Sequence, residues 1–266
     1  MKIGEGIKFF FIKIKNAIVD FCKNFFPKGF PKKKLFPLLL MLLVESISTQ
    51  MISAYCGYLI VDIGVASSVD DAGNYSGWLI SSFFLAQFCS SFVIGSLSDN
   101  FGRRPMLLIG TFGIAITNIM FGFSFNYFYA ICTRLLNGLL NGNVGVVKTY
   151  MGEITDDSNR VQTFSFIGLT WALGGVFGNF LGGVLYDPCS KYPSIFGNMK
   201  LFEQFPALLP QGSIGILGLF ILVLAYFYLP ENVVIEKDTN GERENKCKTV
   251  CKSILSVFVK MFKLHL

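Results

Sequence analysis

The sequence has little charge and almost no histidine. Asp, Glu, Lys and Arg make up 15% of its 266 residues, against about 25% in a typical soluble domain. The one histidine, His265, stands next to the end of the chain, so no histidine-based ligand set exists. No phosphate-binding loop and no pairing of a nucleophile with a base is recognisable. These absences argue against an enzyme, and we expect neither a cofactor or metal nor a nucleic-acid partner.

Several classes of membrane protein are excluded in the same way. The sequence has no potassium-channel filter, no voltage-sensor pattern of arginine at every third position and no Asn-Pro-Ala pair of a water channel. The Pro-x-(Asp/Glu)-x-x-(Lys/Arg) repeat of mitochondrial carriers is absent too. The N-terminal residues lack the continuous apolar core and small-residue cleavage site of a signal peptide.

What the sequence does have is apolar surface. Hydrophobic residues make up 52% of it, with 29 phenylalanines, and the mean hydropathy is +0.54. A helix needs about 20 apolar residues to cross the hydrocarbon core of a bilayer. Six such segments predict an all-α membrane protein whose six transmembrane helices form one bundle over residues 35–229. The predicted spans are Leu35–Ile60, Trp78–Ser98, Met106–Ser124, Tyr127–Val147, Phe164–Tyr186 and Gly212–Leu229.

Two basic segments flank the predicted bundle, residues 1–34 and residues 230–266. The first carries nine lysines, mostly off an apolar helical face, which predicts an amphipathic segment on an anionic membrane surface. The loop before the second span holds three aspartates and no base, whereas the next loop holds Arg103 and Arg104. This bias places both termini in the cytosol. Asn74, in the only Asn-x-Ser/Thr sequon, then lies outside as a candidate glycosylation site.

Two charged residues lie inside predicted spans. Glu45 stands ten residues into the first span and Arg134 seven residues into the fourth. An unpaired charge near the bilayer centre costs at least about 2.5–3.5 kcal/mol, and such residues usually serve a solute pathway or a proton relay. We interpret both as candidates for proton coupling; the alternative is that they pair with each other. Four further polar residues face either a cavity or another helix: Gln87, Asn137, Asn141 and Asn143.

The connection after the second span reads "GSLSDNFGRRP", which is too short for a domain linker. Gly102 permits a tight turn with unusual backbone angles. Arg103 and Arg104 hold the turn at the cytoplasmic face, and Asp99 can pair with a neighbouring arginine. A charge cluster of this kind can latch two helix bundles together in one state and release them in another.

These motifs resemble those of the major facilitator superfamily. Its signature loop, Gly-x-x-x-Asp-(Arg/Lys)-x-Gly-Arg-(Arg/Lys), is matched at Gly95, Asp99, Gly102, Arg103 and Arg104, with Asn100 in place of the usual base. The resemblance implies that Glu153 completes the latch and that Arg134 takes part in proton coupling. It also implies an antiporter-type glycine motif in "GGVFGNFLGG", with Asn179 in place of its proline; the matching glycines are Gly174, Gly178, Gly182 and Gly183.

A narrower resemblance, over nearly all of residues 35–235, is to the zinc-induced facilitator-like group. It rests on "RLLNGLLNGNVGVVKTYMGEITD", "FSFIGLTWALGGVFGNFLGGVL" and "PCSKYPSIFGNMKLFEQFPALLP". Glu45 matches the acid of that group's first span, with Ser46 in place of the following proline. The resemblance implies proton-coupled antiport of small organic acids, metal chelators, cations or drugs. Sugar porters fit less well, because "LPEN" follows the sixth span instead of Pro-Glu-Ser-Pro-Arg.

The superfamily holds its substrate between two six-helix bundles, each a 3+3 repeat, and this sequence supplies one of them. We interpret the chain as the N-terminal half of such a carrier. Its expected partners are a small-molecule substrate, protons, the lipid bilayer and a C-terminal six-helix half from the same gene or another chain. The alternative is a non-transporting membrane module, a sensor or an assembly partner, derived from a half-carrier.

Overall fold

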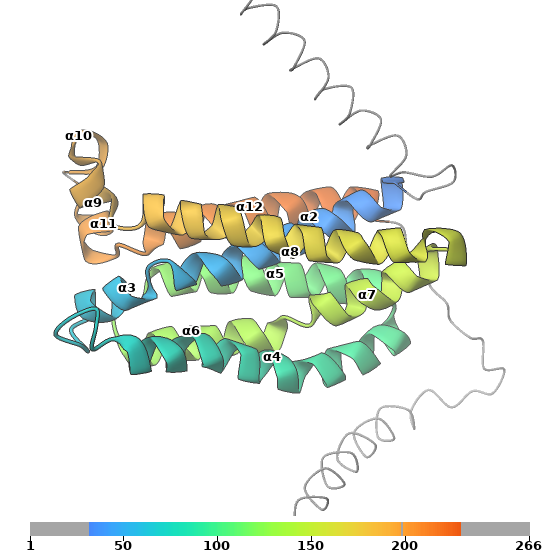
Figure 1. Ribbon diagram of the computed structural model, residues 1–266, viewed down its shortest axis with the longest axis horizontal. Helices are drawn as coiled ribbons and strands as arrows, with labels where there is room; N and C mark the ends of the chain where they lie inside the picture. Colours follow the sequence, from blue (N-terminus) through green and yellow to red (C-terminus); the bar gives the residue numbers. More distant parts are fainter. Residues whose placement is uncertain (1–31, 198, 230–266) are drawn as a thin grey trace, which may run out of the picture.

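The computed structural model describes residues 32–197 and 199–229. Over these residues the chain consists of helices joined by turns and short connections. The long helices lie side by side along one common direction (Figure 1). The segment predicted at residues 1–34 lies outside the described residues except for its last three, and the segment at residues 230–266 lies outside them entirely.

Five helices are long and apolar enough to cross a membrane. They correspond to the first, second, third, fifth and sixth predicted spans. Their bounds are α2 (Lys32–Ser53), α4 (Gly73–Phe101), α5 (Arg103–Gly122), α8 (Asp157–Leu185) and α12 (Leu208–Tyr228).

The helix α2 lies at the centre of the bundle, packed against α8 and α12, while α4 packs on α6 and α5 packs on α12. In its most apolar stretch α2 is 72% buried, whereas the corresponding stretches of α4 and α8 are each only 28% buried. Since α4 and α8 both contribute residues to one shared cavity, they flank an open side of the bundle.

The first predicted span ends earlier than expected. A turn at Tyr55 separates α2 from a short helix, α3 (Cys56–Asp62). The Tyr55 ring stacks on Tyr186 with 4.7 Å between ring centroids, and its hydroxyl accepts a hydrogen bond from Gln211 at 2.6 Å. These tertiary contacts hold Tyr55 in the turn, so the prediction of one helix as far as Ile60 is wrong.

The fourth predicted span is not one helix either. It is divided into α6 (Tyr127–Leu140) and α7 (Asn143–Ile154), which follow each other along the bundle (Figure 1). The chain leaves the helix at Asn141 and Gly142. A Cβ at Gly142 would lie 2.6 Å from the Ile94 side chain, so the break allows α4 to approach closely.

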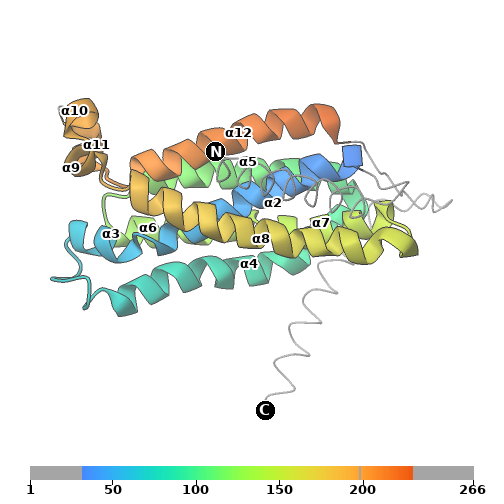
Figure 2. The same cartoon turned by 45° about the horizontal axis from the view of Figure 1, so that its top comes forward.

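The connections gather at the two ends of the bundle. At one end, Gly102 joins α4 to α5 with a φ of +97°, a conformation that favours glycine. At the other end lie three short helices, α9 (Pro188–Lys191), α10 (Pro193–Phe196) and α11 (Lys200–Gln204), as Figures 1 and 2 show. We call the end of the bundle that holds Gly102 the latch end.

Glycines set the spacing between α8 and α2. A Cβ at Gly178 would lie 2.7 Å from the Ile47 carbonyl oxygen, and Cβ atoms at Gly174 and Gly182 would meet Ser46 and Met51. Side chains at these positions would push the two helices apart. Gly183 is different, because a Cβ there would meet nothing within 4 Å.

Candidate functional site

Glu45 is the acidic group at the centre of the site. It lies in the middle of α2 and is 1% exposed. The Gln87 amide nitrogen donates to its Oε1 at 3.3 Å, and the Asn141 side chain lies close to the same carboxyl group. Its Oε2 has no hydrogen-bond partner among the described residues. The carboxyl group therefore keeps one oxygen available for a proton, a water molecule or a ligand.

Arg134 is the basic group inside the bundle. It lies on α6, is 1% exposed, and its guanidinium lies over the Phe83 ring at 4.4 Å from the centroid. Its Nε and Nη2 have no acceptor within the described ranges. No ion pair joins Arg134 to Glu45 among the described residues, so the alternative that these two residues pair with each other is wrong.

The other predicted polar residues separate into two groups. Gln87 borders Glu45, whereas Asn137 and Asn143 lie between helices. The Asn137 amide donates to Asn118 Oδ1 at 3.3 Å, and the Asn143 amide donates to Thr111 at 3.4 Å. Asn118, which sequence reasoning missed, also accepts from the hydroxyl of Ser48 at 2.9 Å. A hydrophilic residue within a span was the signal that could have found it.

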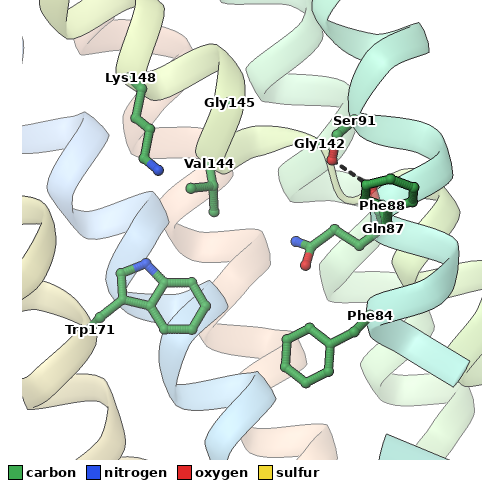
Figure 3. Close-up of a pocket in the computed structure, with 9 residues that line it drawn as sticks. All are labelled: Phe84, Gln87, Phe88, Ser91, Gly142, Val144, Gly145, Lys148 and Trp171. Carbon is green, nitrogen blue, oxygen red and sulfur yellow. Dashed lines mark hydrogen bonds between the residues drawn. The ribbon is translucent and has the colours of Figure 1, made fainter. Parts of the chain in front are cut away.

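A cavity of about 420 Å³ opens between α4, α7 and α8. Its volume falls in the range of about 300–1,000 Å³ typical of small-molecule sites. Figure 3 shows its lining, and we call it the cleft. The residues that line it are Phe84, Gln87, Phe88, Ser91, Gly142, Val144, Gly145, Lys148 and Trp171.

The aromatic walls of the cleft were not predicted. On α4, the lining residues fall at positions 84, 87, 88 and 91, the spacing that places side chains on one helical face. That periodicity was a usable signal. Trp171 comes from α8, and its backbone carbonyl accepts a hydrogen bond from the Ser46 hydroxyl at 3.2 Å. Ser46 therefore ties α8 to α2 directly behind the cleft.

The charged cluster at the latch end is built around Arg103. Its Nε and Nη2 each lie 3.1 Å from Glu153 Oε1, and its Nη1 donates to the Ser98 hydroxyl at 2.6 Å. Nη1 also pairs with Asp99 one turn earlier. The guanidinium thus joins the end of α4 to the end of α7. We call Asp99, Arg103 and Glu153 the latch.

Arg104 has a separate role in the same turn. Its Nη2 donates to the Tyr226 carbonyl at 2.6 Å, and the guanidinium lies over the Tyr226 ring at 5.3 Å from the centroid. A cation in the last turn of a helix interacts favourably with its dipole and carbonyl groups. Arg104 therefore fixes the end of α12 to the start of α5.

Two predicted positions have no packing role within the bundle. A Cβ at Gly95 would meet nothing within 4 Å, although the residue belongs to the signature loop. Asn74 is exposed in the first turn of α4, at the end opposite the latch.

A bundle of membrane-length helices with a buried acid beside a cavity defines a helical integral membrane protein. The chain belongs to the Major Facilitator Superfamily, whose model matches residues 38–263. It is close to the zinc-induced facilitator-like group, which confirms both resemblances. It is 35% identical over 206 residues to Protein ZINC INDUCED FACILITATOR 1 of Arabidopsis thaliana, covering 77% of this chain and 42% of that protein.

Two further comparisons agree on family and fold. The chain is 35% identical over 204 residues to the Major facilitator superfamily multidrug transporter mfsB of Aspergillus fumigatus, covering 76% of this chain and 34% of that protein. The crystal structure of the human organic anion transporter MFSD10 (TETRAN) superposes with a TM-score of 0.58 at 20% identity, covering 75% of this chain and 48% of that one. The chain thus spans less than half the length of these relatives. The fold is the all-helical one of the superfamily, and the chain is a multi-pass integral membrane protein.

Proposed function

We propose that this chain forms one half of a secondary active transporter that exchanges a small organic solute for protons. The observation that carries the proposal is Glu45, a fully buried carboxyl with one unpartnered oxygen beside the cleft, among the residues described. Gln87 contacts the carboxyl and also lines the cleft, so it links a proton site to a solute site. The expected solutes are organic acids, metal chelators, cations or drugs.

The coupling follows from hydrogen-bond chemistry. An ionised carboxyl only accepts hydrogen bonds, whereas a protonated one also donates. When Glu45 takes up a proton, the Gln87 amide can turn its oxygen toward the new donor and present its nitrogen to the cleft. The solute and the proton then compete through one side chain.

We further propose that α6 and α7 together make a broken fourth span, giving a six-span 3+3 bundle over residues 35–229. Flanking cytosolic segments would occupy residues 1–34 and 230–266. Both chain termini then lie in the cytosol, and Asn74 lies outside, where it is open to glycosylation. The basic latch end supports this orientation.

The open side of the bundle is where a second six-helix half would lie. Its helices α4 and α8 are largely exposed, and Gly95, Gly145 and Gly183 lie next to empty space. Alternating access would rock the two halves about a substrate held between them. The latch at Arg103 would hold them in one state and release them in the other.

Solute flux in sealed vesicles tests this function. The chain is reconstituted alone and together with the C-terminal six-helix half of a homologous carrier, with and without a pH gradient. Panels of organic acids, chelates and cationic drugs are offered. Gradient-driven flux that disappears in Glu45→Gln supports the proposal. No flux from a correctly inserted chain, with or without the second half, favours a non-transporting module.

A further inference from the structure

We infer that the cleft binds a flat, apolar organic anion, with Lys148 as the group that holds its charge. The inference rests on the transport role proposed above and names the substrate class of that site. It draws on three features of the cleft: its aromatic walls, its charge and the hydrogen-bond donors left unused in it.

The walls of the cleft fit a flat apolar body. Phe84 is 46% exposed, Phe88 is 55% exposed, and Trp171 faces them across the open space in Figure 3. Aromatic side chains stack on flat ligands and bury a large apolar area at little entropic cost.

The charge of the cleft is positive. Lys148 is the one charged residue among the nine that line it, and it pairs with no carboxylate of the described part of the chain. Glu45 is close by but 1% exposed, and Gln87 stands between it and the cleft. Lys148 lies one residue beyond the predicted fourth span, at the edge of the cleft, where an ammonium group attracts a counter-ion. The structure supplies none, so a bound anion fits this position.

The hydrogen-bond donors of the cleft that have no partner among the described residues lie on the wall that carries Lys148. On α4 the Ser91 hydroxyl donates to the Gln87 carbonyl at 2.5 Å, and the Gln87 amide nitrogen donates to Glu45. The Lys148 amine and the Trp171 indole nitrogen make no hydrogen bond to any described residue. Figure 3 shows both on the wall opposite Gln87. A carboxylate or sulfonate between them would accept from both, with its apolar body against Phe84.

A cation is the competing occupant, since aromatic faces also attract cations. Three probes of one shape separate the possibilities: 4-nitrobenzoate, 4-nitrobenzamide and 4-nitrobenzylammonium. Nitroaromatic groups quench tryptophan fluorescence on contact. The chain has two tryptophans, and Trp78 lies 70% exposed at the far end of α4. In a Trp78→Phe background, quenching therefore reports binding beside Trp171 alone. The whole 266-residue chain is measured in an uncharged detergent at low salt.

We expect 4-nitrobenzoate to bind about tenfold more tightly than the amide, the size of effect that one charge-assisted hydrogen bond gives. The cation should bind more weakly than the amide. Lys148→Gln should remove the preference for the anion, and Lys148→Arg should keep it. Lys191→Gln is the matched control, because that amine is bonded to the Gly183 carbonyl in the outer connection.

Equal quenching by the three probes, a preference for the cation, or an anion preference that survives Lys148→Gln would each overturn the inference. The readout is binding, so it is independent of the vesicle experiment. Gradient-driven flux without this anion preference would leave transport standing and remove the substrate class. Anion binding that depends on Lys148, with no flux from either assembly, would support the binding of an anion in the cleft and remove the proposed transport.

Discussion

The bundle holds its charges in two contrasting ways. At the latch end, Arg103 uses all three guanidinium nitrogens, on Glu153, Ser98 and Asp99. These groups are partly in contact with solvent, since the side chains of Arg103, Glu153 and Asp99 are 13%, 27% and 62% exposed. In the interior, Glu45 and Arg134 are each 1% exposed, and within the described residues each has polar atoms without a partner.

The difference separates two tasks. Ion pairs that reach solvent are weaker than fully buried ones, so they can break and re-form during a conformational cycle. Buried polar atoms without partners are costly to keep, and a fold retains them against stability when they serve a ligand or proton. The latch is therefore suited to switching, and the interior to binding. Variants in the interior should abolish transport without lowering stability. Variants of the latch should lower stability and only reduce transport.

The largest effect is expected at Glu45. Glu45→Gln keeps the size and the hydrogen bond to Gln87 but removes the exchangeable proton. Gradient-driven flux should fall to the level of empty vesicles, while the helical content and the unfolding temperature stay unchanged. Flux in sealed vesicles and thermal unfolding in detergent measure the two quantities.

Asn118→Asp serves as the opposite control for this variant, because it places a new carboxyl beside Ser48 and away from the cleft. It should not restore flux to Glu45→Gln. Full gradient-driven flux in Glu45→Gln would show that the proton is carried elsewhere.

The second effect is expected at Arg134 and concerns stability. Arg134→Met removes the guanidinium from the Phe83 ring and with it a buried charge that no described residue pairs. Replacing a buried ion pair with apolar residues of similar volume is often neutral or stabilises by about 1–4 kcal/mol, and a buried charge without a partner has no pairing energy to lose. We expect the free energy of unfolding to rise within that range and coupled flux to be lost. A less stable Arg134→Met protein would contradict this, and would mean that bound water or an anion satisfies the guanidinium.

The same contrast explains what the sequence could predict. The latch residues Asp99 and Arg103 lie one turn apart, so their spacing alone brings them together. The interior depends on contacts between distant segments. Gln87 reaches Glu45 across 42 positions, and Trp171 joins Phe84 only through the packing of α8 and α4 around one cleft.

The two breaks in predicted spans have the same origin. Tyr55 is held in a turn by Tyr186 and Gln211, which are more than a hundred positions away in the sequence. At Gly142 the chain leaves the helix next to Ile94, which is 48 positions away in the sequence. Hydropathy reports the environment of a segment, and it contains no information on these tertiary contacts. It therefore predicted the five membrane-length helices and missed where the helices of the first and fourth spans end.

The third effect is expected at the latch itself. Arg103→Gln should lower the free energy of unfolding by about 1.5–3 kcal/mol, because Arg103 is only 13% exposed and loses its charged hydrogen bonds. A double-mutant cycle with Glu153→Gln should give a coupling energy of about 0.5–3 kcal/mol. Flux should fall severalfold, whereas binding of 4-nitrobenzoate in the cleft should not change.

Arg160→Gln is the matched control for this cycle. Its pair with Asp157 at 3.3 Å lies within one exposed helical turn and joins no two helices. It should change neither flux nor stability measurably. A loss of cleft binding in Arg103→Gln would contradict the separation of switching from binding.

The smallest effect is expected at Arg104. Arg104→Lys keeps the positive charge near the last turn of α12 but loses the planar group that bonds the Tyr226 carbonyl while lying over its ring. A charge at a helix end contributes about 0.3–1 kcal/mol, and most of that should survive. The contribution of the Arg104 guanidinium lying over the ring can be measured separately, because Tyr226→Phe keeps the ring and Tyr226→Leu removes it. We expect Tyr226→Phe to match the parent protein, and Tyr226→Leu and Arg104→Lys to lower the unfolding temperature slightly and by similar amounts. A large destabilisation by Tyr226→Phe would show that the hydroxyl, and not the ring, holds the start of α5 against the end of α12.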